Sequence, residues 1–378
     1  MNQLSEKKKI LITGAFGFIG SNLLKNLCND YELLALDLQS ASPPTPPAFA
    51  GAGSPPALPS VAGEGGEIYP AFFSWQDLDL IPWDSIDTVI HLAGKAHDTR
   101  NTAAEQEYFD INVGLTEKIA ERFFNSSAKK LIYFSSVKAV ADSWPEGWLT
   151  EEVEPDPKTA YGRSKLEAES VLTRVLSSRL EPGSADTPHP PAPSPAVASL
   201  PGEGGNPIPN TRYPIPDTRN LVYILRPCMI HGPGNKGNLN ELVRFVKSGL
   251  PWPLGAFENQ RSFTSIDNLV YIIKQLIDRD IEPGIYQMAD DEPLSTNELI
   301  RMIATAMKKK SRIWKISPGI IRGATRIGDR LGLSLNRERL QKLTESYRVS
   351  NRKLKNALGV DRMPVAAAEG LKTTLQSL

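Results

Sequence analysis

The sequence predicts an α/β protein built on a doubly wound parallel sheet, followed by a smaller and mainly helical C-terminal lobe. Short β-rich runs alternate with helical segments, which indicates crossover connections between parallel strands with helices on both faces. A glycine-rich turn joins the first strand to the first helix. From about Gly232 onward the pattern becomes helical and less regular. We therefore divide the chain into a sheet domain, residues 1–231, and a lobe, residues 232–378.

Each element follows from a local pattern. Apolar and β-branched runs predict strands at residues 8–13, 31–37, 88–93, 130–135 and 221–226. Longer stretches with apolar residues at helical spacing predict helices at residues 17–27, 104–124 and 161–176. The lobe contains two further strand patterns, at residues 261–266 and 284–289.

Two segments differ in composition from the rest of the chain. Residues 39–66 and 181–219 together hold 18 of the 31 prolines and are rich in glycine and serine. The twelve residues that begin at Pro56 match those that begin at Pro195 at 7 of 12 positions. Because proline removes backbone donors and glycine adds unfolded-state entropy, we expect neither segment to pack. We interpret both as copies of one low-complexity insert; the alternative is a proline-rich ligand for a partner protein.

Composition limits the classes of function. The chain has 43 basic and 43 acidic residues, so it lacks a global field that would attract nucleic acid or a membrane surface. We interpret the lysine runs at residues 7–9 and 308–310 as solvated ends of a strand and a helix; a local anion contact is the alternative. Two cysteines and no apolar run of about 18 residues favour a reducing, cytoplasmic location. No spacing of histidine, cysteine or aspartate suggests a metal site.

The turn Gly14-Ala-Phe-Gly17-Phe-Ile-Gly20 predicts a dinucleotide site. Gly14 permits the tight turn, Gly17 lets the backbone approach a pyrophosphate at the helix N-terminus, and Gly20 lets helix and strand pack closely. Asp37 ends the second strand, where a carboxylate accepts hydrogen bonds from ribose hydroxyls and repels a 2′-phosphate, so NAD is favoured over NADP. The remaining candidate cofactor contacts are Phe16, Phe18 and Ile19 in the turn, Asp77 and Leu78 at the adenine, and Ala93 and Gly94 after the third strand.

Tyr161-Gly-Arg-Ser-Lys165 is the strongest catalytic motif. Tyrosine and lysine four residues apart lie on one face of a helix. The ammonium and a bound nicotinamide both favour the phenolate, so we expect the pKa of Tyr161 to be lowered toward neutrality. Tyr161 can then exchange a proton with a substrate hydroxyl, while Lys165 also holds the nicotinamide ribose. Ser135 and Ser136 end the strand before this helix, and we expect Ser136 to contact the reacting oxygen.

Together with HLAG at residues 91–94 and RPCMIHGPG at residues 226–234, these motifs resemble the NAD-dependent epimerase/dehydratase family of extended short-chain dehydrogenases/reductases, which have a Rossmann-type fold. The resemblance covers nearly the whole chain outside the inserts. FSSVKAVAD and GPGNKGNL look most like the branch of UDP-glucose 4-epimerases and UDP-N-acetylquinovosamine 4-dehydrogenases of surface-polysaccharide pathways. The resemblance implies a UDP-sugar substrate and a homodimer.

The same resemblance implies roles for single residues. It maps the serine, tyrosine and lysine of the family onto Ser136, Tyr161 and Lys165, and an asparagine of the long helix onto Asn112. On the substrate side it implies that Leu254 borders the uracil, Arg261 binds the diphosphate and Asn238 contacts a phosphate. The chain departs from the family pattern at His231, where tyrosine is common, and at Val140-Ala141, where tyrosine-glycine is common. The resemblance therefore does not determine which residues form the wall of the pocket.

The residues after Ser136 bear on the reaction type. Sugar dehydratases of this family have an acidic pair there, whereas this chain has Val137 and Lys138, so elimination would lack its acid. An epimerase that transiently oxidises C4 of a UDP-hexose is our first hypothesis. A 4-keto reductase that consumes NAD(P)H is the alternative, and a cofactor-binding regulator and a proline-rich scaffold are the hypotheses from other classes.

Overall fold

The computed structural model describes residues 7–38, 70–96, 104–180, 220–235, 238–331 and 337–377. Both proline-rich segments predicted at residues 39–66 and 181–219 lie outside these ranges. In the described part, no helix is long and apolar enough to span a bilayer.

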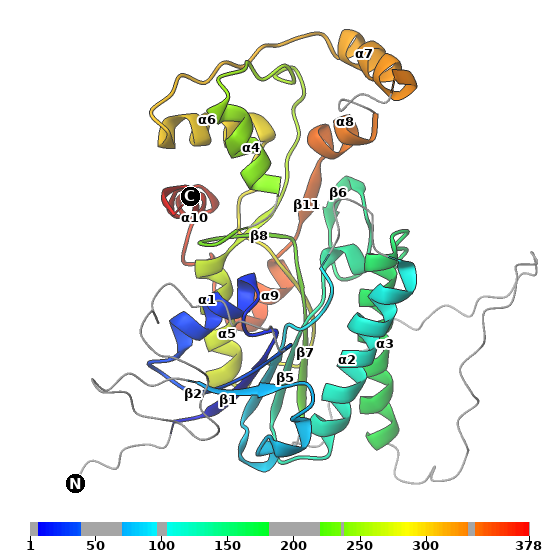
Figure 1. Cartoon of the computed structure of the whole chain (residues 1–378), viewed down its shortest axis with the longest axis vertical. Helices are drawn as coiled ribbons and strands as arrows, with labels where there is room; N and C mark the ends of the chain where they lie inside the picture. Colours follow the sequence, from blue (N-terminus) through cyan, green and yellow to red (C-terminus); the bar gives the residue numbers. More distant parts are fainter. Residues whose placement is uncertain are drawn as a thin grey trace, which may run out of the picture.

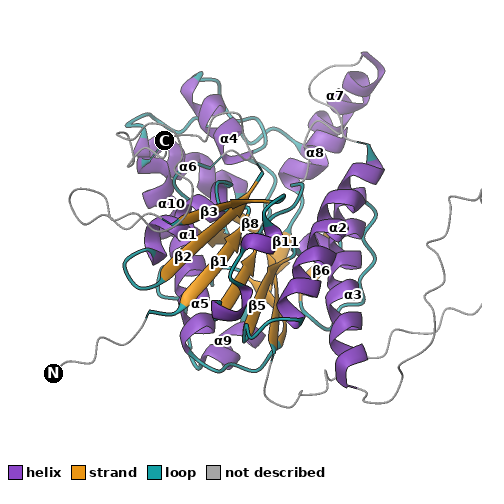
Figure 2. Ribbon diagram, turned by 60° about the horizontal axis from the view of Figure 1, so that its bottom comes forward, coloured by secondary structure: helices purple, strands orange, loops and turns teal. Residues whose placement is uncertain are grey.

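A seven-stranded parallel sheet forms the centre of the protein, in the order β3-β2-β1-β4-β5-β7-β10. Chain order reverses between β1 and β4, and the crevice at the carboxyl ends of such strands is where doubly wound sheets bind ligands. The predicted fold class is therefore confirmed (Figure 2). The strands are β1 Lys9–Thr13, β2 Glu32–Asp37, β3 Ala71–Ser74, β4 Thr88–His91, β5 Lys130–Phe134, β7 Leu221–Pro227 and β10 Gly284–Met288.

Helices cover both faces of the sheet because successive residues of each buried strand point to opposite sides. Ile10 and Ile12 of β1 contact one core, which includes apolar residues of α1 (Phe18–Leu27), α5 (Ile266–Asp278) and α9 (Arg352–Leu358). Leu11 contacts the other core, under α2 (Glu105–Phe124) and α3 (Ala160–Leu180). Figure 2 shows α1, α5 and α9 on one side of the sheet and α2 and α3 on the other.

The lobe has its own apolar core and lies above the sheet in Figure 1. Its helices are α4 Asn238–Lys247, α6 Thr296–Ala306, α7 Pro318–Leu331, α8 Arg337–Thr344 and α10 Ala367–Gln376. Two small parallel pairs connect it to the sheet domain: β8 (Met229–His231) with β9 (Phe263–Ser265), and β11 (Tyr347–Val349) with β6 (Trp144–Leu149). Short 3-10 helices lie at Leu78–Leu80, Trp83–Ser85 and Val137–Ala139.

The observed elements differ from the predicted ones in two respects. Four strands were not predicted: β3, β8 and β11 have only three or four residues, too few to show a pattern, and β6 is interrupted by Pro145 and Gly147. The strand expected in the lobe at residues 284–289 is β10, which extends the main sheet next to β7, and α5 packs on the sheet as well. Residues 232–378 thus contribute to the central sheet domain as well as to the lobe. A sequence pattern predicts a strand but not the strand with which it pairs.

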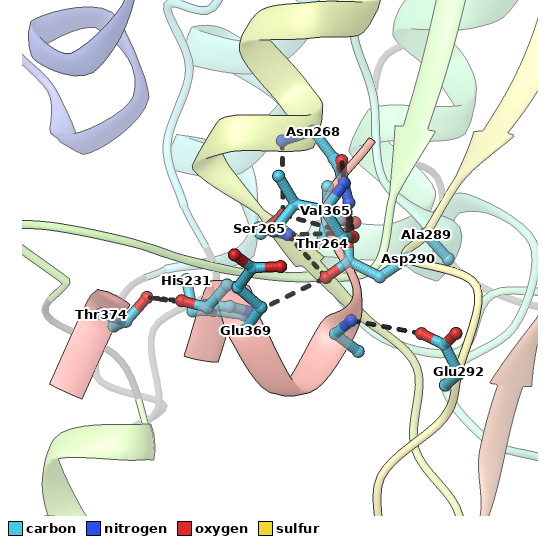
Figure 3. Close-up of polar contacts among 12 residues, drawn as sticks. His231, Thr264, Ser265, Asn268, Ala289, Asp290, Glu292, Val365, Glu369 and Thr374 are labelled. Carbon is cyan, nitrogen blue, oxygen red and sulfur yellow. Dashed lines mark hydrogen bonds and ion pairs between the residues drawn. The ribbon is translucent and has the colours of Figure 1, made fainter. Parts of the chain in front are cut away.

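A buried polar cluster fixes the lobe where it meets the sheet (Figure 3). Asp290, which follows β10, accepts hydrogen bonds from the Ser265 backbone at 3.1 Å and from Asn268 Nδ2 at 2.7 Å. His231 Nε2 lies 3.8 Å from Asp290 Oδ2, and His231 Nδ1 lies 2.8 Å from the Thr374 hydroxyl in α10. His231 therefore serves as a buried link between β8 and the C-terminal helix.

Candidate active site

The glycine-rich turn after β1 has the geometry that a pyrophosphate site requires. Gly14 adopts a φ of 66°, and a Cβ there would lie 2.8 Å from the backbone nitrogen of Ala93. A Cβ on Gly20 would lie 2.3 Å from the carbonyl oxygen of Gly14, so the helix can approach the turn only without a side chain. The first turn of α1 has no acidic residue and no side-chain cap at Gly17, which leaves its amide groups available for an anion.

Asp37 lies at the end of β2, beside this turn. Its carboxylate accepts hydrogen bonds from the backbone nitrogens of Phe16 and Leu38, both at 2.7 Å. Asp37 is the register partner of Ser74, and Asp77 accepts hydrogen bonds from the Ser74 hydroxyl and backbone. These bonds lower the pKa of Asp77. Asp77 therefore belongs to the same edge of the sheet as Asp37.

Apolar residues complete this side. The rings of Phe16 and Phe72 lie 5.4 Å apart, and Phe18 and Ile19 pack partly against the core under α1. Leu78 packs partly against the core under α2.

Ala93 and Gly94 connect the glycine-rich turn to the predicted catalytic residues. The backbone nitrogen of Ala93 donates to the Thr13 hydroxyl at 3.1 Å, so the loop after β4 contacts the end of β1. A Cβ on Gly94 would lie 2.7 Å from Asn112 Oδ1 and 3.3 Å from Lys165 Nζ. The candidate cofactor site and the candidate catalytic helix thus meet at Gly94.

The structure brings Ser136, Tyr161 and Lys165 to the carboxyl end of β5. The Ser136 hydroxyl hydrogen-bonds to the phenol of Tyr161, and it also accepts from the Lys138 backbone at 3.2 Å. Lys165 Nζ donates to the Phe134 carbonyl at 2.9 Å and lies over the ring of Tyr133. The three residues thus lie together at the carboxyl end of β5, with Lys165 next to Gly94.

Burial dominates the electrostatics of the pair on α3. It lowers the pKa of Lys165 to about 8, an effect that the nearby Glu169 opposes. Burial also raises the pKa of Tyr161, although the hydrogen bond from Ser136 acts in the opposite direction. The spacing of Tyr161 and Lys165 predicts a lowered pKa for Tyr161. In the protein alone this pKa is raised, because removal of the phenolate from water outweighs its hydrogen bond to Ser136.

Sequence reasoning missed a buried polar group beneath the catalytic helix. Arg226 in β7 donates to Glu169 through Nε at 2.9 Å and through Nη2 at 2.5 Å, and the Ser135 hydroxyl donates to the same carboxylate. Both members of this ion pair are almost fully buried. Ser135 is therefore engaged by Glu169, whereas Ser136 contacts Tyr161. The spacing of Glu169, one turn after Lys165, is the signal that could have suggested it.

Two more buried polar residues shape the site. Asn112 accepts from the Lys95 backbone at 2.7 Å and donates to the Ser164 hydroxyl at 2.9 Å, so its amide joins α2 to α3 next to Gly94. His91 contacts Thr13 at 2.7 Å and Thr116 at 3.1 Å. Burial and the charge of Lys165 lower the pKa of His91 to about 3, so it stays neutral and serves packing.

The predicted substrate residues occupy different surroundings. Arg261 forms backbone bridges with Leu294 and Tyr347, and the Tyr347 hydroxyl donates to the Ala141 carbonyl at 2.6 Å, close to Ser136. Burial lowers the pKa of Arg261, while Glu345 and Tyr347 raise it. Leu254 is buried in the core of the lobe at 3% exposure, and the side chain of Asn238 lies outside the described part. In the described ranges, no group of three or more histidine, cysteine, aspartate or glutamate side chains is arranged to hold a metal ion.

The amino-acid sequence is similar to a known family and to individual epimerases. Residues 10–179 match the model of the NAD dependent epimerase/dehydratase family. The chain is 28% identical to a UDP-glucose 4-epimerase of Vibrio cholerae over 98% of this chain and 95% of that protein. It is 24% identical to an N-acetyl-alpha-D-glucosaminyl-diphospho-ditrans,octacis-undecaprenol 4-epimerase of Escherichia coli O157:H7, over 80% of this chain and 73% of that protein.

Solved structures share the fold. The UDP-glucuronic acid 4-epimerase of Bacillus cereus in complex with NAD superimposes with a TM-score of 0.61 at 17% identity and covers 98% of each chain. The Bordetella bronchiseptica enzyme WbmG in complex with NAD gives a TM-score of 0.64 at 17% identity, over 99% of this chain and 95% of that one.

Proposed function

Since the chain belongs to the NAD-dependent epimerase/dehydratase family, we propose that it inverts C4 of a nucleotide-activated hexose with NAD as its cofactor. The contact between Ser136 and Tyr161, beside Lys165 and Gly94, carries this proposal. It joins an acid–base group to the crevice in which a dinucleotide fits. NAD bound there would accept a hydride from C4 and return it.

The residues present fit that cofactor. The turn at Gly14 and Gly20 has no room for a Cβ, so a pyrophosphate can approach the backbone at the start of α1. Asp37 presents a carboxylate toward ribose hydroxyls and would repel a 2′-phosphate, which favours NAD over NADP. Phe16, Phe18 and Ile19 line the turn, Asp77 and Leu78 border the adenine, and Ala93 and Gly94 leave room near the nicotinamide.

Tyr161 takes the proton of the C4 hydroxyl in one direction and returns it in the other. Ser136 donates a hydrogen bond to the same oxygen and keeps it next to the phenol. Lys165, as an ammonium, holds the ribose of the nicotinamide and stabilises the phenolate. The positive charge of the oxidised nicotinamide adds to this stabilisation, which offsets the rise in the Tyr161 pKa that burial causes.

The substrate is held from the lobe. Arg261 binds the diphosphate with its planar guanidinium, and Leu254 borders the base. Asn112 orients the loop at Gly94, and Asn238 contacts a phosphate. UDP-hexoses are the first candidates, because UDP-glucose 4-epimerase is the activity named for the Vibrio cholerae relative.

Two features of the assembly and location accompany this proposal. The exposed faces of α2 and α3 around Asn112 and Tyr161 would form the contact of a homodimer. Cys28 and Cys228 are both free, which agrees with a reducing cytoplasm. The role in surface-polysaccharide synthesis follows from the resemblance to the branch named above.

The test is to incubate the purified protein with UDP-glucose or UDP-N-acetylglucosamine and to follow the C4 epimer by proton NMR. We expect conversion without added nucleotide, because the cofactor is regenerated in each turnover. Stoichiometric oxidation of NADH or NADPH with a UDP-4-keto-6-deoxy sugar, and no epimer from either hexose, would establish the reductase instead.

A further inference from the structure

The charges of this neutral chain are unevenly distributed. From Arg301 to Gly328 the sequence has eight basic residues and no acidic one, although the whole chain has 43 of each. The basic residues are Arg301, Lys308, Lys309, Lys310, Arg312, Lys315, Arg322 and Arg326. A zero net charge removes a global field, but a stretch of this kind creates a strong local one.

The structure places this stretch on one end of the lobe. The connection between α6 and α7 crosses the top of the molecule in Figure 1, far from the seven-stranded sheet. It is anchored there, because the Trp252 backbone donates to the Arg312 carbonyl at 2.7 Å and the Trp314 backbone donates to the Trp252 carbonyl at 2.8 Å. Lys309 Nζ also donates to the Lys247 carbonyl at the end of α4 at 2.7 Å. The cations are thus held on a folded surface.

A cavity of about 350 Å³ opens within this surface. Its apolar part is formed by Phe245, Val246, Leu250, Trp252, Ile300 and Ala304, and Lys309, Lys310 and Arg312 also line it. A cavity with an apolar floor and three cations suits an amphiphile with a phosphate group.

Large apolar side chains are exposed at this end of the lobe, one of them in the lining of the cavity and two in the chain that follows the cations. Leu250, Trp314 and Ile320 keep 61%, 57% and 66% of their surface accessible to solvent. Tryptophan and leucine or isoleucine next to lysine and arginine are the combination that inserts into the headgroup region of a bilayer. Exposure of this kind costs hydrophobic free energy in water, which contact with acyl chains recovers.

We propose that this end of the lobe docks on a bilayer that contains anionic phospholipids, with a lipid phosphate in the cavity. The docking surface consists of Leu250 and of the segment from Lys308 to Ile320. Charge complementarity selects the lipid class, and the exposed apolar side chains distinguish a bilayer from a nucleic acid. A surface that binds single-stranded RNA usually offers several aromatic rings on which bases stack, whereas this surface exposes one tryptophan among aliphatic side chains. The proposal does not depend on the epimerase activity.

Vesicle flotation of the full chain tests the proposal. The vesicles are pure phosphatidylcholine, or phosphatidylcholine with about one third phosphatidylglycerol. We expect flotation with the anionic vesicles only, and release by about 0.5 M NaCl, because surface charges are screened at that ionic strength. The double variant Lys309→Gln/Lys310→Gln should partition about thirtyfold more weakly, from the loss of two cations near the surface.

The matched control is Lys25→Gln/Lys118→Gln, which removes two exposed lysines from α1 and α2. It should float like the wild type, and both double variants should unfold within a few degrees of the wild-type temperature, since Lys309→Gln removes one exposed hydrogen bond. Trp314→Ser should weaken flotation at every salt concentration. Equal flotation with neutral and anionic vesicles, an equal loss in the control variant, or no flotation at all would overturn the proposal. So would binding of an RNA oligonucleotide that Lys309→Gln/Lys310→Gln abolishes while vesicles stay unbound.

Discussion

Replacing Glu169 with glutamine perturbs the ion pair that supports the catalytic helix. The Glu169 and Arg226 side chains are only 4% and 3% exposed, and two hydrogen bonds of 2.9 and 2.5 Å join them. Glutamine keeps the size of the side chain and one acceptor, but it removes the carboxylate charge that the buried guanidinium of Arg226 contacts. Removing one partner of a buried pair costs about 3–5 kcal/mol, and the retained acceptor places this variant near the lower end.

The same change should alter the pH dependence of catalysis. Glu169 raises the pKa of Lys165, which burial lowers to about 8, so the variant should lower it further. Because the ammonium form of Lys165 is the active one, the rate is lost as the pH rises through this pKa. The alkaline limb of the kcat/KM profile should therefore move to lower pH in Glu169→Gln.

Urea unfolding and a pH profile of epimerisation measure the two effects. Glu167→Gln is the control, because Glu167 lies on the same helix with its side chain 48% exposed and, among the described residues, pairs with the exposed Arg174. That variant should stay within about 0.5 kcal/mol of the wild type and keep its pH profile. Adding Arg226→Met to Glu169→Gln should restore part of the stability but not the pH profile. An unchanged unfolding midpoint together with an unchanged alkaline limb in Glu169→Gln would refute this reasoning.

Three further substitutions test the cofactor side of the site. Gly94→Ala should lower kcat at least about tenfold, because its Cβ would lie 2.7 Å from Asn112 Oδ1. Gly114→Ala is the control: its Cβ meets nothing within 4 Å, so it should leave kcat unchanged and stabilise α2 by about 0.5–1 kcal/mol. Equal kcat values in the two variants would contradict this. Gly20→Ala should reduce the NAD released on denaturation, since its Cβ would lie 2.3 Å from a backbone oxygen of the turn; full NAD content would show that the turn can relax. Asp37→Ser should reduce the ratio of the NADP to the NAD dissociation constant of the apoprotein by about tenfold in titrations. An unchanged ratio would mean that Asp37 only supports the turn through its hydrogen bond to the Phe16 backbone.

Local features of the site were accessible from the sequence, and long-range ones were not. The glycine spacing and the four-residue spacing from Tyr161 to Lys165 are set within one turn and one helix, so the pattern determines the geometry. Glu169 and Arg226 are 57 residues apart, and Tyr347 bonds to Val137 across 210 residues. Such contacts depend on strand order and on the docking of the lobe.

The pKa of Tyr161 shows a second limit. The sequence reveals the ammonium neighbour, which favours the phenolate, but not the depth of burial, which opposes it more strongly. The position of β10 was equally hidden: its sequence predicts a strand but does not show whether that strand belongs to the lobe or to the main sheet. Packing depth and pairing partner are properties of the folded chain alone.

Removal of the Tyr161 hydroxyl tests most directly whether this phenol transfers the proton in epimerisation. Tyr161→Phe should lower epimerisation of UDP-glucose by about 10²- to 10⁴-fold with bound NAD unchanged, because the acid–base group is removed and the ring is kept. Tyr108→Phe is the matched control, since its ring packs edge-on against Tyr161 with 6.2 Å between the centroids, and it should retain nearly all activity. Turnover of Tyr161→Phe within about threefold of the wild type would contradict the assignment of proton transfer to this phenol.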